Sequence, residues 1–377
     1  MSQIAKALRS LHVSPEVIAS RTGLSITRVN EILDGGEASL SELLRLSKGL
    51  RVSLQFLSGS SREDITNEVN LLFRRVGNLD QNIDPTREHA EKFVSAAIEV
   101  LKPRDCLPGW MDGLQPEEES YGEAERLAYA VRARLSPENL LEPMTNLAAL
   151  LGNEGQIVVS VLHQSRFEGA SLISKNIPFI FVSRRFAGRM LFTLAHELGH
   201  ILAHHRDQDS AIFEKASEIG GPKQRKREAF VDAFASILLL PSEGIGRMLA
   251  EIRRMFQIPD GPLGDIEVLL LARYFGVSFD VAARRCEALS LLPKGGAYSL
   301  SAKIKEEYGS PEKRANEAGL PPRKEVHVPN ISTNLMQEIC KNIELKAISV
   351  GWAADSFGVS VDEIFAFRKT KVDGYSH

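Results

Sequence analysis

One stretch decides both the fold and the chemistry of this chain: Arg189-Met-Leu-Phe-Thr-Leu-Ala-His-Glu-Leu-Gly-His-Ile-Leu-Ala-His204. It contains the pattern His-Glu-x-x-His, and its leucines recur at the spacing of one helix face, at Leu191, Leu194, Leu198 and Leu202. Residues four apart lie on the same face of a helix, so the imidazoles of His196 and His200 can bind one metal ion. The stretch therefore predicts a metal-binding helix.

Glu197 lies one step around this helix from His196. Its carboxylate can reach a metal-bound water rather than the metal. Zinc lowers the pKa of such a water toward 7, and a carboxylate base can then take its proton. The alternative is a solvated helix with two surface histidines.

A catalytic zinc ion needs a third protein ligand and an open fourth position. The best candidate is Glu228, in Glu228-Ala-Phe-Val-Asp232. Glu228 and Asp232 share a helix face, so one can bind the metal while the other orients a ligand histidine. The alternative for Glu228 is a surface charge in a basic neighbourhood.

Two further histidines compete for the role of third ligand. His204 follows His200 by one turn but lies too far along the helix axis for the same ion, and His205 is its neighbour. A longer zinc-protease pattern would need a histidine at position 206, where this chain has Arg206. The sequence therefore disfavours that class.

Composition sets limits on compartment and partners. The chain has 377 residues, 46 Lys and Arg against 49 Asp and Glu, and three cysteines without CxxC spacing. No global basic charge attracts nucleic acid, and no disulfide scaffold is expected. Since no apolar run is long enough to span a bilayer, we expect no membrane association and a cytoplasmic protein.

The expected fold class is α+β and mostly helical. We divide the chain into a helix-turn-helix bundle at 1–58, a helical linker and Pro/Gly-rich loop at 59–119, a peptidase domain at 120–292 and a helical C-terminal region at 293–377. Three short strand-like runs, at 156–162, 170–174 and 179–183, predict a small three-stranded antiparallel sheet within the peptidase domain.

The peptidase segment resembles a known family. The stretch quoted above, followed by Glu228-Ala-Phe-Val-Asp-Ala-Phe-Ala-Ser-Ile-Leu-Leu-Leu-Pro241, is similar to the ImmA/IrrE metallopeptidases, and Tyr274-Phe-Gly-Val-Ser278 fits their closing helices. The resemblance covers residues 120–292. Many relatives carry a second acidic residue where this chain has Phe230, a change that does not threaten the metal site.

The resemblance implies a zincin-like zinc peptidase, with Zn²⁺ on His196, His200 and Glu228 and with Glu197 as catalytic base. Family members cleave helix-turn-helix repressors and so switch on genes after DNA damage or during phage and mobile-element responses. One branch accompanies bacterial anti-phage defence operons. A protein substrate of the repressor type is therefore implied for this chain.

The N-terminal helices resemble the Xre/Cro type of helix-turn-helix. If they dock on DNA as that type does, the recognition helix offers four residues to the groove, namely Ser25, Thr27, Arg28 and Asn30. Residues 1–58 carry seven Lys and Arg against five Asp and Glu, which is a weak charge for DNA binding. The alternative is a protein-docking or dimerising domain.

The basic cluster at 223–227 is either a solvated face or a contact for a nucleic-acid activator.

Cys106 lies in a stiff loop, Pro103-Arg-Asp-Cys-Leu-Pro-Gly109. A thiolate is a better zinc ligand than water, so Cys106 on the fourth position of the metal would silence the enzyme until displaced. The alternative is an inert loop cysteine.

Three functional hypotheses follow from these features. The first is a regulated zinc endopeptidase whose second oxyanion donor is open among Tyr298, His163 and Tyr274. The second is a DNA-binding regulator that uses the peptidase fold as a sensor. The third is an antitoxin-like binding module, for which Glu197→Gln would have no effect.

Overall fold

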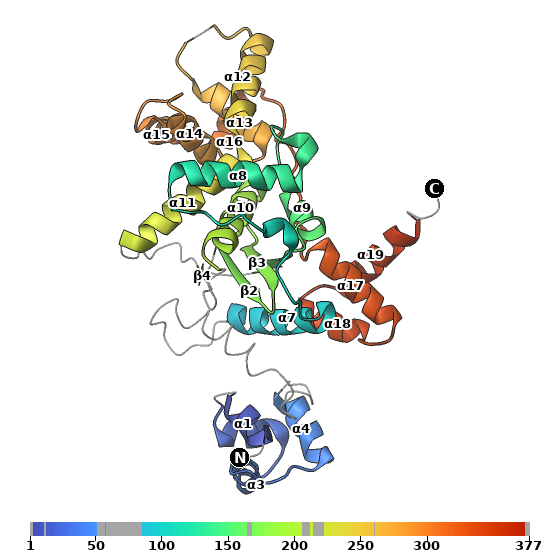
Figure 1. Cartoon of the computed structure of the whole chain (residues 1–377). Helices are drawn as coiled ribbons and strands as arrows, with labels where there is room; N and C mark the ends of the chain where they lie inside the picture. Colours follow the sequence, from blue (N-terminus) through green and yellow to red (C-terminus); the bar gives the residue numbers. More distant parts are fainter. Residues whose placement is uncertain are drawn as a thin grey trace. The chain divides into compact units, whose positions relative to one another are not determined.

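The computed structural model describes residues 3–10, 13–50, 57, 85–163, 168–205, 212–213, 222–259 and 261–373. The chain divides into two compact units, Met1–Leu71 and Leu72–His377, which are described separately below (Figure 1). Within the described ranges, no single helix has the length and apolar character needed to cross a membrane. One pair of helical segments, Arg225–Leu239 and Ser242–Phe256, reaches that length and apolar character only when taken together, and the pair is bent at the break between them.

The described part of the first unit contains four helices: α1 (Gln3–Ser10), α2 (Pro15–Thr22), α3 (Ile26–Leu33) and α4 (Leu40–Leu50). Gly23 ends α2 in the left-handed conformation with φ of 68°, and the Ser25 side chain caps α3 by accepting from the Arg28 amide. Buried apolar side chains from all four helices form its core, namely Leu8, Ile18, Val29, Ile32 and Leu46, and Leu57 adds to it. The structure therefore has two helices joined by a tight turn at Gly23; the assignment of this unit as a helix-turn-helix domain that binds DNA remains a prediction.

The predicted DNA-contacting residues differ in their surroundings. Arg28 donates to Glu42 Oε1 at 2.8 Å and to Glu31 Oε2 at 2.7 Å. Hydrogen bonds from Arg28 lower the pKa of Glu42 to about 2, so this pair stays charged at all but the most acidic pH. Thr27 and Asn30 are exposed. Arg28 would have to leave two carboxylates before it could contact a phosphate.

The second unit is built around a mixed sheet. Its strands are β1 (Val158–Leu162), β2 (Gly169–Ser174), β3 (Ile177–Ser183) and the short β4 (Ile212–Phe213), in the order β1-β3-β2-β4. β2 and β3 form a hairpin whose two turn residues, Lys175 and Asn176, both have positive φ, as a type I′ turn requires.

The expected antiparallel arrangement is wrong for β1. β1 pairs with β3 in parallel, Val158 opposite Phe179. β3 lies between β2 and β1. It is antiparallel to β2, its hairpin partner, and parallel to β1. All seven residues of β3 are buried. Burial on both faces explains why its sequence is a continuous apolar run rather than an alternating one.

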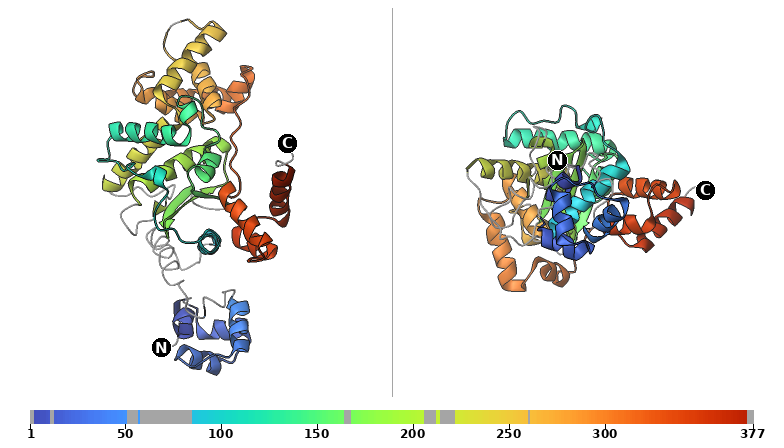
Figure 2. Two further views of the ribbon diagram at one scale, coloured as in Figure 1. Left: turned by 45° about the vertical axis from the view of Figure 1, so that its right-hand side comes forward. Right: turned by 90° about the horizontal axis from the view of Figure 1, so that it is seen from below.

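Helices cover the two faces of this sheet (Figures 1 and 2). α10 (Ala187–Ala203) packs against one face, and α7 (Pro85–Leu101) lies on the other. The Phe181 ring of β3 meets the Phe93 ring of α7 with centroids 5.6 Å apart, and Phe93 in turn meets Phe357 of α18 (Val350–Phe357) at 5.4 Å. Residues 85–101, expected in a linker, thus form one layer of the fold.

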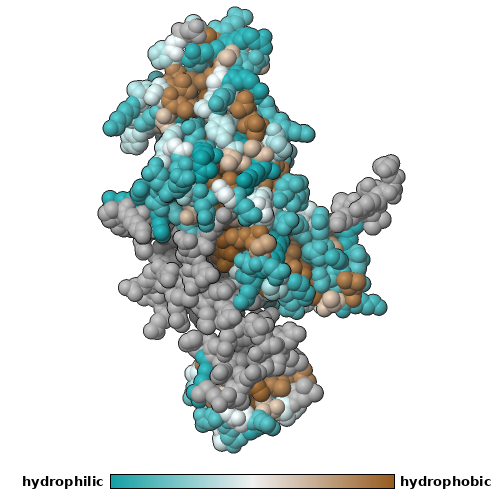
Figure 3. Space-filling model, in the orientation of Figure 1, coloured by the Kyte–Doolittle hydropathy of each residue, from teal (hydrophilic) through white to brown (hydrophobic). Residues whose placement is uncertain are grey.

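The remaining helices surround α10 or extend from it. The layer over α10 consists of α8 (Tyr121–Leu135), α9 (Leu147–Asn153), α11 (Pro222–Leu239) and two 3₁₀ turns, η1 (Gly109–Met111) and η2 (Pro137–Asn139). Beyond it lie α12 (Ser242–Phe256), α13 (Asp265–Phe275), α14 (Phe279–Ala288), α15 (Gly296–Tyr308) and α16 (Pro311–Glu317). Figure 3 shows hydrophobic patches on this upper part. The exposed apolar side chains of α12 include Met255 and Phe256.

A buried arginine fixes the end of α11. The Arg132 side chain is fully buried and donates to four backbone carbonyls, those of Leu140, Leu238, Asn139 and Glu142. Burial lowers the pKa of Arg132 to about 10, so its guanidinium keeps its charge near neutral pH. These acceptors offset the cost of burying the charge, and they hold α11 against α8.

The C-terminal region belongs to the second unit. The backbone at 330–332 pairs with β1: the Val161 amide donates to the Asn330 carbonyl at 2.8 Å, and the Ser332 amide donates to the Val159 carbonyl at 2.8 Å. It is followed by α17 (Thr333–Glu344), α18 (Val350–Phe357) and α19 (Val361–Asp373). The helical C-terminal region therefore covers part of the sheet that carries the site.

Candidate metal centre

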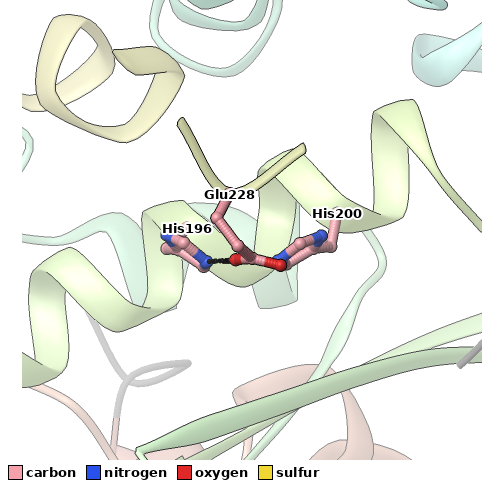
Figure 4. Close-up of side chains that lie close together, drawn as sticks. All are labelled: His196, His200 and Glu228. Atoms are coloured by element: carbon pink, nitrogen blue, oxygen red, sulfur yellow. Dashed lines mark hydrogen bonds and ion pairs between the residues drawn. The ribbon is translucent and has the colours of Figure 1, made fainter. Parts of the chain in front are cut away.

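α10 presents two imidazoles on its face toward α11 (Figure 4). The ring centroids of His196 and His200 lie 4.9 Å apart, and their Nε2 atoms are 3.1 Å apart. His196 is 5 % exposed and His200 is fully buried. The helix predicted from the sequence thus directs both ring nitrogens toward one point.

α11 supplies the carboxylate of Glu228 at the same point. Its Oε2 lies 3.4 Å from Nε2 of His196 and 3.4 Å from Nε2 of His200. The two helices approach closely because Gly199 has no side chain: a Cβ there would lie 2.9 Å from Cδ1 of Phe234. The glycine inside the His-Glu-x-x-His stretch therefore lets α11 bring its carboxylate to the histidines.

The donor set fits a zinc ion. Among the described residues, these three side chains form a group of potential ligands whose donor atoms all lie within 4.8 Å of one another. A tetrahedral zinc bound at about 2.0–2.1 Å separates its donors by about 3.3–3.4 Å. The separations here are 3.1, 3.4 and 3.4 Å. Nitrogen lone pairs and a carboxylate so close together repel one another unless a positive charge lies between them.

Asp232 lies one turn after Glu228, and its Oδ1 is 3.0 Å from Nδ1 of His196. A carboxylate accepts only, so the ring carries its proton on Nδ1, and in the neutral imidazole Nε2 keeps its lone pair. A carboxylate behind a histidine is the arrangement that orients a metal ligand. The geometry is the one predicted from the Glu-x-x-x-Asp spacing.

Glu197 is fully buried beside the donor set, on the side of α10 toward β2. Ser171 of β2 donates from Oγ to Oε2 of Glu197 at 2.5 Å, and the same Oγ lies 3.1 Å from Nε2 of His205. The sheet therefore fixes the carboxylate that the sequence proposes as base. Ser171 was not predicted as a site residue, because nothing in its local sequence indicates this contact.

β2 approaches Glu197 so closely that its first residue must be glycine. A Cβ at Gly169 would lie 2.4 Å from Cγ2 of Thr193 and 2.7 Å from Oε1 of Glu197. Contacts below 3 Å force a shift, and here the carboxylate is one of the groups that would have to shift. Gly169 thus contributes to the site because its lack of a side chain leaves room for the Glu197 carboxylate.

We expect Gly169→Ala to displace Glu197 and to destabilise the fold by about 1–3 kcal/mol, the usual cost of overpacking. Thermal unfolding and the rate of peptide-bond cleavage would both be measured. Gly122→Ala is the control, since a Cβ there meets no atom within 4 Å. An alanine variant at 169 with the wild-type melting temperature and rate would contradict this account of the strand.

The two competing histidines are close but are not in the donor group. Nδ1 of His204 lies 2.9 Å from Nδ1 of His200, and Nε2 of His204 lies 3.2 Å from Oε1 of Glu119. Burial lowers the pKa of His204 to about 3, which keeps this ring neutral. His205 contacts Ser171 instead. Both histidines therefore lie behind the donors rather than among them.

The structure does not bring Cys106 to the metal centre. Cys106 is exposed, and the donor group does not include it. The Arg104 amide, two residues earlier, donates to the Lys175 carbonyl at 3.2 Å, and Asn176 Nδ2 donates to the Arg104 carbonyl at 2.8 Å. These contacts hold the loop at the β2–β3 turn, whereas Glu197 adjoins the opposite end of β2.

The three candidate oxyanion donors lie on different elements. Tyr274 of α13 donates to Glu142 Oε2 at 2.7 Å, and burial raises the pKa of its phenol. Tyr298 of α15 is 80 % exposed and lines an open cavity of about 840 Å³ between α14 and α15. His163 is exposed directly after β1. The structure selects none of them.

The candidate metal centre lies in a segment that is similar to a known peptidase family. Residues 157–287 match a peptidase family model described as the IrrE N-terminal-like domain. The match supports the resemblance of this segment to the ImmA/IrrE peptidases. The IrrE-like segment spans β1 to α14 and contains His196, Glu197, His200, Glu228 and Asp232. A search of curated proteins found no match to the chain. Glu119 and the C-terminal helices lie outside the IrrE-like segment.

Proposed function

We propose that this protein is a zinc-dependent endopeptidase. The observation that carries this proposal is the convergence of two imidazoles and a carboxylate at tetrahedral spacing, with a second acidic residue, Glu197, fixed beside them. The match to a metallopeptidase family over the same residues supports it independently.

Each residue of the site has a distinct task. A zinc ion held by His196, His200 and Glu228 would polarise the scissile carbonyl and lower the pKa of a water molecule bound to it. Glu197 takes a proton from the attacking water and returns it to the leaving amine. Ser171 donates to one oxygen of that carboxylate, which fixes the direction of the other oxygen.

The substrate that we propose is a helix-turn-helix repressor of stress or phage-defence genes, as the resemblance to ImmA/IrrE peptidases implies. Cleavage would switch these genes on, under a signal such as a DNA-damage product. The small helical unit at the N-terminus is available either for docking the repressor or for binding DNA. The internal ion pairs of Arg28 favour docking, because they occupy the one arginine on α3.

Co-expression with the helix-turn-helix repressor encoded beside this chain tests the function. We expect a shortened repressor whose new terminus, read by mass spectrometry, is absent when the chain carries Glu197→Gln. An intact repressor under every inducing condition, including DNA damage, would contradict the peptidase. Regulation of the same genes by the Glu197→Gln variant would then point to a DNA-binding regulator with a sensory peptidase fold.

A further inference from the structure

Behind His200, a chain of three side chains leads away from the metal centre. Nδ1 of His200 lies 2.9 Å from Nδ1 of His204, and Nε2 of His204 lies 3.2 Å from Oε1 of Glu119. His200 is fully buried and His204 is 8 % exposed, so water cannot easily replace these contacts. Glu119 precedes α8, outside the segment that matches the family model.

Glu119, the last of these three side chains, determines where the protons lie on His204 and His200. The carboxylate of Glu119 accepts only, so His204 carries its proton on Nε2. In the neutral ring, Nδ1 of His204 is then an acceptor, and Nδ1 of His200 must be the donor. Nε2 of His200 therefore keeps its lone pair, and that nitrogen is the one directed at His196 and Glu228. These contacts direct the lone pair there whether or not a metal is bound.

Glu119 also contacts the second ligand helix. Its Oε1 lies 3.6 Å from Nε of Arg227, the residue directly before Glu228 on α11. One carboxylate thus links the end of α10, through His204, to the first part of α11. Both helices supply metal donors, so the position of Glu119 bears on the relative placement of those donors.

We propose that Glu119, acting through His204, is a positioning residue that orients His200 for zinc and raises the affinity of the site. This role rests on the metal site of the proposed function and extends it to the acidic loop before α8. Asp232 does the same for His196 through a single contact, whereas His200 uses a second histidine as intermediate. Outer residues of this kind contribute about 10–100-fold in metal affinity.

The test measures zinc affinity of the full chain by competition with a chromophoric chelator, with zinc alone as the probe. We expect Glu119→Ala to weaken zinc binding by about 10–100-fold. Glu119→Gln should weaken it less, because an amide oxygen still accepts from His204. Glu118→Ala, the exposed neighbouring acid, is the matched control and should bind zinc as the wild type does.

Two further measurements separate positioning from loss of folding. The zinc-free Glu119→Ala variant should still unfold in one cooperative transition, like the zinc-free wild type, at a melting temperature only a few degrees lower. In a His204→Phe background, Glu119→Ala should cause no additional loss of affinity, since its route to His200 is already cut. If Glu119→Ala does not fold, His204→Phe alone must still show the 10–100-fold loss.

The outcomes distinguish this role from the proposed function. A wild-type chain that binds no zinc overturns the metal site and this role together. A wild-type chain that binds zinc tightly, with an affinity unchanged by Glu119→Ala or by His204→Phe, overturns the positioning role and leaves the peptidase standing. Equal losses in Glu119→Ala and Glu118→Ala would show a general effect of surface charge and would also overturn the positioning role.

Discussion

Replacing Glu197 by glutamine is expected to slow cleavage of the proposed repressor substrate by about 10²–10⁴-fold, the contribution of a positioned acid–base group, while zinc stays bound. The amide keeps the size of the side chain and can still accept from Ser171, so the local packing survives. What it loses is the ability to take up a proton. The cleavage rate and the zinc content of the purified variant would be measured side by side.

Glu154→Gln is the control for this substitution, since Glu154 is an exposed acid at the end of α9. It should cleave at the wild-type rate. Cleavage by Glu197→Gln at that same rate, with zinc bound, would remove Glu197 from the chemistry. It would favour a binding module, for which this substitution has no consequence.

The donor residues could be predicted from the sequence because their relation is local. Four residues along a helix bring two side chains to one face whatever surrounds the helix, so His196 and His200 were predictable from spacing alone. The same rule gave Glu228 and Asp232 as a pair on one face. The meeting of the two helices is not local: the sequence offered Glu228 only as the best candidate for a third ligand, and the fold brings its carboxylate to the histidines.

The supporting residues could not be predicted, because their contacts join distant segments. Ser171 reaches Glu197 across 26 positions, and Glu119 reaches His204 across 85. Neither residue has a local pattern that marks it. A serine in a strand and a glutamate in an acidic run are ordinary surface or core residues until the fold places them.

Chain topology was also beyond local reasoning. The three strand segments were predicted close to their actual bounds. The parallel pairing of β1 with β3, however, arises because β3 lies between β1 and β2, and the local sequence does not give that order. The position of Cys106 likewise depends on distant contacts: its chemistry suits zinc, whereas Arg104 holds its loop at the turn formed by Lys175 and Asn176 in this structure.

The segment that matches the family model does not complete its own sheet. Phe181 of β3 lies on the face away from α10 and packs on Phe93 of α7, which in turn packs on Phe357 of α18. Both covering helices lie outside residues 157–287. Exposure of such aromatic surface costs on the order of 2–3 kcal/mol per side chain, so the regions before and after this segment stabilise the sheet that carries Ser171.

Removal of zinc is expected to abolish cleavage and to lower the stability of the chain. A ligand that binds only the folded state at about 1,000 times its dissociation constant contributes about 4 kcal/mol, which corresponds to roughly 5–10 °C in melting temperature for a chain of this size. Melting curves and cleavage rates would be recorded after dialysis against a chelator and again after zinc is restored. Because His200 and Glu228 lie on different helices, removal of zinc should weaken the packing of α10 against α11. This weakening would be measured as faster amide hydrogen exchange in both helices.

A variant that lacks two donors, His200→Ala with Glu228→Ala, separates specific binding from a general effect of the chelator. Its melting temperature should not respond to zinc at all, whereas His163→Ala, which removes an exposed histidine outside the donor group, should respond as the wild type does. An equal zinc response in the wild type and in the two-donor variant would place the bound ion elsewhere in the chain. The carboxylate and the paired rings would then be a hydrogen-bonded cluster rather than a metal centre.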